Sequence, residues 1–267
     1  MVARVLSVLL VTGALTHARS GEPSPDVTVP PPAGQFVIVP LRVHVLTSDL
    51  PDIDCKLTDA DVERIVGKVN RAWNVAGVHF GLESIVREPA ARQDQFVRVR
   101  EQIGAAPLGL FRILRPDDTR AFDGVHVYYV HKLPVNGVWM NEDFAIVQET
   151  ARLREVEGGI DEPVPRVTSH ELGHALGLPH RQDTTNLMAS GTTGTLLNAE
   201  EVKTAREKAG QVKGALTYGA CRERVETWEK GCEGKEELDR LRRWVDAVDR
   251  AAPKLREAAS PGSDGSR

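Results

Sequence analysis

The stretch HELGHALGLPH, residues 170–180, combines three histidines and one glutamate at fixed spacings. Residues four apart lie on one face of a helix, so His170 and His174 can direct two imidazoles at one ion. Gly177 follows one turn later, and glycine tolerates backbone angles that are closed to other residues. The chain can therefore leave the helix sharply and bring His180 back as a third ligand. Three protein nitrogens leave one position for water, which is the arrangement of a catalytic zinc site.

Glu171 follows the first histidine and is the predicted general base. Zinc lowers the pKa of a bound water toward about 7, and Glu171 would accept the proton as the water attacks a peptide carbonyl. Thr168-x-x-Glu171 also matches a capping box, which would commit Glu171 to the helix end. Pro163 and Pro165 offer an earlier start for a helix predicted over residues 167–178, because proline is common in the first turn. We therefore favour the catalytic role.

Residues 1–20 have the pattern of a secretory signal peptide. Arg4 gives a positive start, residues 5–15 are mostly apolar, and residues 18–20 (Ala-Arg-Ser) fit a cleavage site. The apolar run is shorter than the about 20 residues that cross a bilayer. We expect an exported chain, extracellular or periplasmic, that leaves the membrane after cleavage. The net charge of −4 argues against a nucleic-acid partner.

Strand and helix patterns alternate along the chain and favour a mixed α/β sheet. The helix that Thr58 opens places Val62, Ile65, Val66, Val69 and Trp73 on one face. Asn198 and Glu201 form a capping box at the start of a second helix, predicted over residues 197–209. Residues 95–100 fit either a short strand or a helix. Strands are predicted at residues 36–47, 78–86, 125–130, 137–140 and 144–148.

The two ends of the chain differ in composition from its centre. Residues 21–35 form a Pro-rich linker, residues 221–259 a charged helical extension, and residues 260–267 a disordered tail. Within the extension, a stripe at helical spacing predicts an amphipathic helix that packs on the domain and ends at Pro253: Leu238, Leu241, Val245, Val248 and Ala252. A partner-binding helix is the alternative.

Three cysteines, Cys55, Cys221 and Cys232, would enter an oxidising compartment on export. Any two of them can pair as far as the sequence shows. Their spacing does not fit a zinc finger, so a cysteine metal site is not expected.

The motif of residues 170–180 resembles the extended zinc signature of the metzincin metallopeptidases. NLMAS, residues 186–190, resembles the methionine turn that lies beneath the metal in that family. The short interval between the third histidine and Met188, with Asp183 inside it, resembles the matrixin branch. The resemblance implies a metzincin-like mixed twisted sheet over residues 36–220, with a long helix, an active-site helix and a C-terminal helix.

The resemblance also assigns roles to side chains. It implies His170, His174 and His180 as Zn²⁺ ligands, Glu171 as the base, and Met188 as a hydrophobic floor that does not bind the metal. Substrate would lie extended along a sheet edge within residues 135–148. Residues 191–195 would line a pocket beside the metal.

Some features depart from the matrixin pattern. We find no cysteine-switch segment, no tyrosine after Met188 and no calcium-loop signature, and Arg181 stands where matrixins usually have serine. The sequence is therefore better described as matrixin-like.

The leading hypothesis is a secreted, monomeric zinc endopeptidase that acts on proteins or peptides. One alternative is a catalytically silent metzincin-fold binding module, and another is a structural domain, each recruiting a partner through its C-terminal helix. The intact Glu171 argues against lost turnover. His44 and His79 are expected to be structural. A second metal site at His126 and His131 has no supporting spacing.

Overall fold

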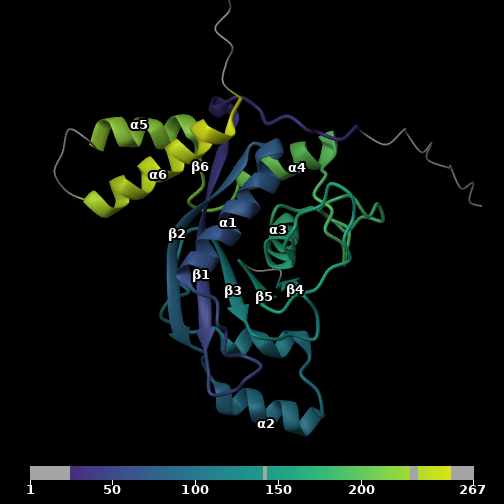
Figure 1. Cartoon of the computed structure of the whole chain (residues 1–267). Coiled ribbons are helices and arrows are strands. Elements are labelled where there is room, and N and C mark those ends of the chain that lie inside the picture. Colours follow the sequence, from purple (N-terminus) through teal and green to yellow (C-terminus); the bar gives the residue numbers. More distant parts are fainter. Residues whose placement is uncertain (1–24, 141–142, 229–233, 254–267) are drawn as a thin grey trace, which may run out of the picture.

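The computed structural model describes residues 25–140, 143–228 and 234–253. The predicted signal peptide and C-terminal tail lie outside these residues, as does Cys232. Six strands form one mixed sheet in the order β2-β1-β3-β5-β4, with β6 paired to β1 (Figure 1). The strands are β1 (Val37–Thr47), β2 (Val78–Pro89), β3 (Val125–Val130), β4 (Gly137–Trp139), β5 (Phe144–Gln148) and β6 (Leu216–Thr217).

The centre of the sheet is parallel and its outer strand is antiparallel. β1 pairs in parallel with β2 and β3, and β3 pairs in parallel with β5. β4 runs antiparallel to β5 and forms one edge of the sheet. The β3 sequence VHVYYV is buried at every position, as expected for a central strand covered on both faces. The predicted strands and the mixed sheet are therefore confirmed.

Three helices cover one face of the sheet. They are α1 (Asp59–Trp73), α3 (Pro163–Ala175) and α4 (Ala199–Ala209), and they share a core with the β1 side chains Val39, Leu41, Val43 and Val45. Thr58 and Asp61 close a capping box at the start of α1, and the predicted apolar face of this helix is buried. The capping box predicted at Asn198 and Glu201 also forms. These helices hold the active-site motif against a rigid sheet.

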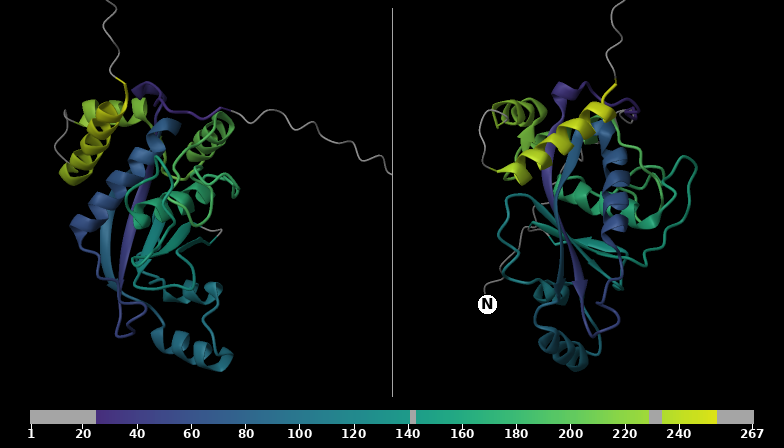
Figure 2. Two further views of the ribbon diagram at one scale, coloured as in Figure 1. Left: turned by 45° about the vertical axis from the view of Figure 1, so that its right-hand side comes forward. Right: turned by 60° about the vertical axis from the view of Figure 1, so that its left-hand side comes forward.

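The opposite face of the sheet carries a second apolar cluster. The short 3-10 helix η3 (Leu108–Leu114) and α2 (Gln93–Ile103) contribute Phe111, Leu114 and Phe96, which pack with Tyr128 and Phe144. The segment that the sequence left open between strand and helix is therefore helical. α2 lies at the end of the molecule opposite to the C-terminal helices (Figure 2).

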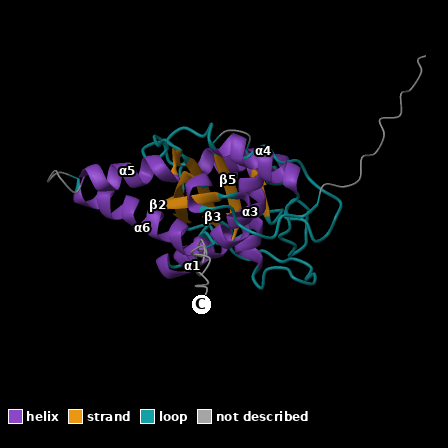
Figure 3. Cartoon of the chain, turned by 90° about the horizontal axis from the view of Figure 1, so that it is seen from above, coloured by secondary structure: helices purple, strands orange, loops and turns teal. Residues whose placement is uncertain are grey.

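The C-terminal extension is a pair of packed helices, α5 (Tyr218–Trp228) and α6 (Lys235–Ala251). The predicted stripe is buried at Leu238, Leu241 and Val248, and Trp244 joins it. The Trp244 ring lies over Gly81 of β2, where a Cβ atom would stand 2.5 Å from the ring. Trp244 Nε1 also donates to the carbonyl of Leu82 at 3.2 Å. The helix therefore packs on the domain, as predicted, beside the β2 edge of the sheet (Figure 3).

Cys55 and Cys221 are both buried free thiols, so the possible pairing between these two is wrong. Burial raises the pKa of the Cys55 thiol to about 12. Pairings that involve Cys232 lie outside the described residues. No described helix combines the length and apolarity that crossing a bilayer requires.

Candidate metal centre

The helix α3 presents the motif to solvent at its C-terminal end. It begins at Pro163, four residues earlier than the predicted start, and proline stands in its first turn. Thr168 lies inside the helix, where its hydroxyl donates to the carbonyl of Val164 at 2.9 Å. Glu171 is therefore an interior residue of α3, and the capping-box alternative is wrong.

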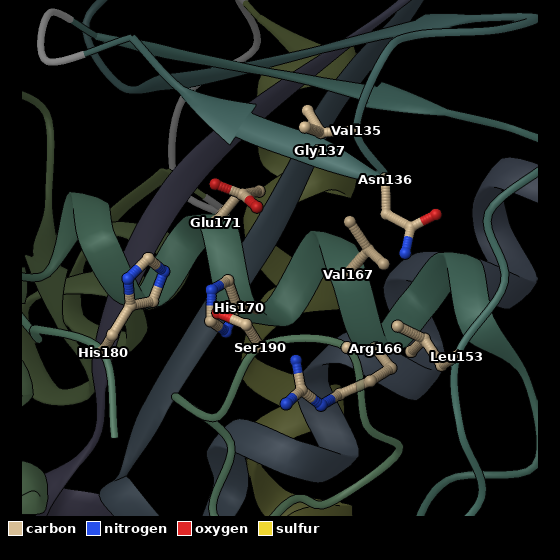
Figure 4. Close-up of a pocket in the computed structure, with 11 residues that line it drawn as sticks. Val135, Asn136, Gly137, Leu153, Arg166, Val167, His170, Glu171, His180 and Ser190 are labelled. Carbon is tan, nitrogen blue, oxygen red and sulfur yellow. The ribbon is translucent and has the colours of Figure 1, made fainter. Parts of the chain in front are cut away.

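A glycine turn ends the helix and redirects the chain. Gly177 has φ of +79°, in the left-handed region that favours glycine. The N–H of Leu178 donates to the carbonyl of Gly173 at 3.0 Å, which closes the turn. The chain then reverses so that the His180 ring lies beside that of His170 (Figure 4) and contacts that of His174. The sharp exit predicted from Gly177 is therefore present, and α3 ends at Ala175, three residues before the expected helix end.

The three histidines converge through the same ring nitrogen. His174 Nε2 lies 3.2 Å from His170 Nε2 and 3.1 Å from His180 Nε2. The His174 ring stands at 86° to the ring of His170 and at 80° to that of His180. Of the residues that the structure describes, these three form the only group of at least three side chains suited to hold a metal ion.

Backbone carbonyls fix which nitrogen carries the proton in two of the rings. His170 Nδ1 lies 2.9 Å from the carbonyl of Leu187, and His174 Nδ1 lies 2.8 Å from that of Leu178. A carbonyl can only accept, so each Nδ1 is the donor and each Nε2 of the neutral ring keeps its lone pair. Burial also lowers the pKa of His170, to about 3. Nitrogen lone pairs that face one another repel, and a cation between them removes this repulsion. The cluster therefore fits Zn²⁺.

Met188, which the resemblance places beneath the metal, packs against the turn of α3 between His170 and His174. Its side chain is fully buried, and a Cβ atom on Gly173 of α3 would stand 2.4 Å from Met188 Sδ. Asn186 Oδ1 accepts from the Met188 N–H at 2.7 Å, and Asn186 Nδ2 donates to Glu201 at 2.8 Å. The methionine turn is thus tied to α4.

Arg181 takes part in the same anchor. Its Nε lies 2.6 Å from Glu201 Oε1, and the Glu201 side chain is 1% exposed. The arginine that departs from the matrixin pattern therefore joins the third histidine to the start of α4 through a charge-assisted hydrogen bond.

Glu171 lies at the base of a cleft between α3 and the edge strand β4. Burial raises the pKa of its carboxyl to about 7, opposed by the Trp139 N–H and the charge of Arg166. A Cβ atom on Gly137 would stand 3.0 Å from Glu171 Cγ and 2.6 Å from the Val167 side chain. Glycine at this position therefore allows β4 to approach the helix closely. The sequence did not indicate this role for Gly137.

Two cavities meet at Glu171 and His180. The first, about 390 Å³, lies beside His170 and extends toward Leu153 and Arg166. The second, about 440 Å³, lies beside His174 and is lined by Val138 and Trp139 of the edge strand. The sheet edge predicted within residues 135–148 therefore borders both cavities.

The predicted pocket loop contributes less than expected. Gly191 lines the first cavity, with Ser190 before it. Thr192 and Thr193 are buried, and the Thr193 N–H and carbonyl bond to Arg154 and Ile160 behind the cavity. Residues 192–195 therefore support the wall rather than form it. The sequence analysis missed the buried Arg166 because nothing in a helical pattern marks which arginine faces a cavity.

The second metal site considered at His126 and His131 is not formed. His126 Nδ1 lies 2.8 Å from His44 Nε2, whereas His131 Nδ1 lies 2.7 Å from Glu149. The two histidines thus belong to separate hydrogen-bonded groups. His44 and His79 are buried in strands, consistent with the structural role expected of them.

Part of the chain is similar in sequence to a known family. The matrixin family model matches residues 95–208. Among solved structures, metalloproteinase-II from Bacteroides fragilis matches with a TM-score of 0.37 and 12% identity, covering 68% of this chain and 56% of that chain. A chain in the structure of a chaperone–substrate complex matches with a TM-score of 0.40 and 11% identity, covering 67% of this chain and 38% of that one.

This chain thus spans between about two fifths and three fifths of the length of the two solved chains. No curated protein matches it significantly in sequence. The matrixin match includes both the three-histidine motif and the methionine turn. Over residues 95–208, which are 114 of its 267 residues, the chain is therefore similar to the matrixin family, and this similarity with the three-histidine group supports a zinc metallopeptidase-type function.

Proposed function

We propose that the chain is a secreted zinc-dependent endopeptidase that hydrolyses peptide bonds in proteins, with Glu171 as its general base. The observation that carries the proposal is the convergence of three Nε2 atoms, within 3.2 Å of the central His174, beside a buried carboxylate at an open cleft. His170, His174 and His180 would hold the ion. Zinc, when bound there, supplies a Lewis acid and lowers the pKa of water.

The chain's own residues account for the remaining steps. Glu171 accepts a proton from the attacking water and passes it to the leaving amine. The carbonyls of Leu187 and Leu178 keep two imidazoles in the tautomer that presents Nε2. The exposed edge of β4 offers backbone groups to an extended peptide, which would bind by strand addition. A long cleft of this kind suits an internal peptide bond of a protein.

Export and the division of the chain are part of the proposal. Residues 1–20 would be removed as a signal peptide, residues 36–220 would form the catalytic domain, and residues 221–259 the helical extension. Expression of the whole chain followed by N-terminal sequencing of the exported product tests this, and a product that keeps residues 1–20 contradicts it.

Casein hydrolysis by the purified chain from residue 21 onward tests the activity. We expect hydrolysis that stops with a zinc chelator and returns with added Zn²⁺. Glu171→Ala should lower the rate by about 10²–10⁴-fold while the zinc content stays the same. Glu200→Ala on the exposed start of α4 is the matched control and should leave the rate unchanged. Zinc binding without hydrolysis by the unmodified chain would favour the silent binding module.

A further inference from the structure

Arg166 of α3 is a buried cation with unused hydrogen-bond donors. Its side chain is 1% exposed and lines the cavity of about 390 Å³ next to His170 and Glu171. Figure 4 shows it on the side of Ser190 and His170, across the cavity from Val135 and Gly137. Arginine keeps its charge inside proteins, so a guanidinium here must be compensated by its surroundings.

Backbone carbonyls satisfy only part of the guanidinium. Nε donates to the carbonyl of Gly194 at 2.6 Å, and Nη2 donates to those of Ala189 at 2.6 Å and Asn186 at 3.4 Å. The two N–H groups of Nη1 have no acceptor among the residues that the structure describes. Within the same residues, no carboxylate forms an ion pair with Arg166. A positive charge therefore borders the cavity without a direct ion pair, and Glu171 interacts with it only through space.

The rest of the cavity defines what kind of anion fits. Val135, Leu153 and Val167 supply aliphatic walls, while His170, Glu171 and His180 mark its end at the reaction site. A ligand group must therefore enter from the scissile bond, run along aliphatic surface and end in a carboxylate. A glutamate side chain has this composition: methylene groups followed by two oxygens that match the fork of an arginine.

We propose that Arg166 makes this cavity a subsite for glutamate at one of the two substrate positions that flank the scissile bond. The inference rests on the proposed endopeptidase function and adds the substrate class. The second cavity, beside His174, would receive the residue on the other side of the bond. Selection follows because the glutamate carboxylate can accept from the two N–H groups of Nη1 and form a direct ion pair, which leucine and glutamine cannot do.

Cleavage of a peptide library from a digested proteome, read by mass spectrometry, tests the subsite. We expect glutamate to be enriched at one position flanking the cut, and kcat/KM to be about tenfold or more higher for a glutamate peptide than for its glutamine counterpart. Arg166→Met should remove this preference at that position alone. Arg154→Met, which changes an exposed arginine nearby, should retain it.

Arg166 also holds the carbonyls of the methionine turn, so its removal can disturb the fold. Leu153→Glu provides a second variant, because it leaves those hydrogen bonds intact and places a carboxylate in the cavity. It should also abolish the preference for glutamate. A preference for aliphatic side chains at both flanking positions would contradict the subsite. A preference for glutamate that survives Leu153→Glu would also contradict it.

Binding provides a readout that does not depend on turnover. Fluorescence anisotropy with the Glu171→Ala chain should show the glutamate peptide binding about tenfold more tightly than the glutamine peptide, and Leu153→Glu added to that chain should equalise them. A wild-type chain that cleaves no peptide contradicts the proposed function, and the binding ratio then decides the subsite separately. Equal affinities for the two peptides would overturn the inference.

Discussion

Two groups of histidines in this chain show opposite arrangements of the same side chain. In the motif of residues 170–180, three rings turn their Nε2 atoms toward one point, and backbone carbonyls hold the far nitrogens of His170 and His174. In the sheet, His44 and His126 form a line instead. Glu88 Oε1 lies 2.6 Å from His44 Nδ1, and His44 Nε2 lies 2.8 Å from His126 Nδ1.

The two groups differ in whether each nitrogen lone pair accepts a hydrogen bond from a neighbouring group. With Glu88 ionised, His44 donates to the carboxylate and accepts from His126, so the donors and acceptors of the pair alternate. The motif has no such alternation, because the Nε2 atoms of His170 and His174 are both acceptors and face each other. Burial and histidine content therefore do not identify a metal site, whereas converging acceptors do.

The largest expected effect is a difference in zinc content between a variant of the motif group and a variant of the sheet group. His174→Ala removes the central ligand, so we expect loss of stoichiometric zinc and of measurable casein hydrolysis. His126→Asn should retain both, because an amide can still donate to His44. Metal analysis of the dialysed variants measures this contrast. Loss of zinc from the His126→Asn chain in its folded state would show that the distinction is wrong.

Loss of the hydrogen bond between His44 and His126 should lower the free energy of unfolding. His126→Ala leaves His44 Nε2 buried without a donor, which costs about 1–3 kcal/mol. The Asn variant should recover part of this loss. Urea unfolding of zinc-loaded protein gives the comparison, and equal free energies of unfolding for His126→Ala and the wild type would mean that the His44–His126 contact contributes nothing.

The pH dependence of the free energy of unfolding is a second test of the buried pair His44 and His126. Burial lowers the pKa of His126 to about 4, below its ordinary 6.5. Between these values the unfolded chain binds a proton that the folded chain does not, so the free energy of unfolding falls as pH decreases from 6.5 toward 4. The loss is at most about 1.4 kcal/mol per pH unit for one histidine. His44 contributes in the same direction, with its pKa lowered to about 2 by burial.

Glu88 acts in the opposite direction, because burial raises its pKa and its protonation favours the folded state at low pH. His126→Asn should therefore reduce the net slope between pH 6.5 and 4 without reversing the contribution of His44. Unfolding curves at half-unit pH steps measure the slope. An identical slope in the variant would show that His126 does not titrate in this range.

The smallest expected effect belongs to a region distant from both groups. Thr58→Ala removes the cap of α1, where Thr58 Oγ1 accepts from the Asp61 N–H at 3.2 Å. Loss of this cap costs about 1 kcal/mol. Zinc content and casein hydrolysis should not change, and a coupled loss of zinc would connect α1 to the metal centre.

The sequence predicted the parts of this molecule that depend on local spacing. The i, i+4 pair His170 and His174, the break at Gly177 and the capping box at Asn198 and Glu201 all involve neighbours within a few residues, and the structure contains each of them. The apolar stripe of α6 was also predicted from its spacing. Trp244, which donates a hydrogen bond to β2, was not identified.

Contacts between distant segments were not predictable in this way. The approach of β4 through Gly137 depends on a helix that follows it by some thirty residues. α5 lies mostly within the predicted helical extension but was not recognised as a separate helix, because it lacks a clear apolar stripe: Tyr218 and Cys221 are its only described buried residues. The position of the Arg166 side chain likewise depends on hydrogen bonds to the backbone carbonyls of residues 186, 189 and 194, which are distant in sequence.

X-ray absorption spectroscopy of the zinc-loaded chain tests the central claim most directly. The geometry of His170, His174 and His180 predicts three imidazole nitrogens at about 2.0–2.1 Å and one further oxygen from solvent. The spectrum should be unchanged in His126→Asn and should lose an imidazole contribution in His180→Ala. A spectrum with sulfur ligands, or with four protein ligands and no solvent oxygen, would contradict the account.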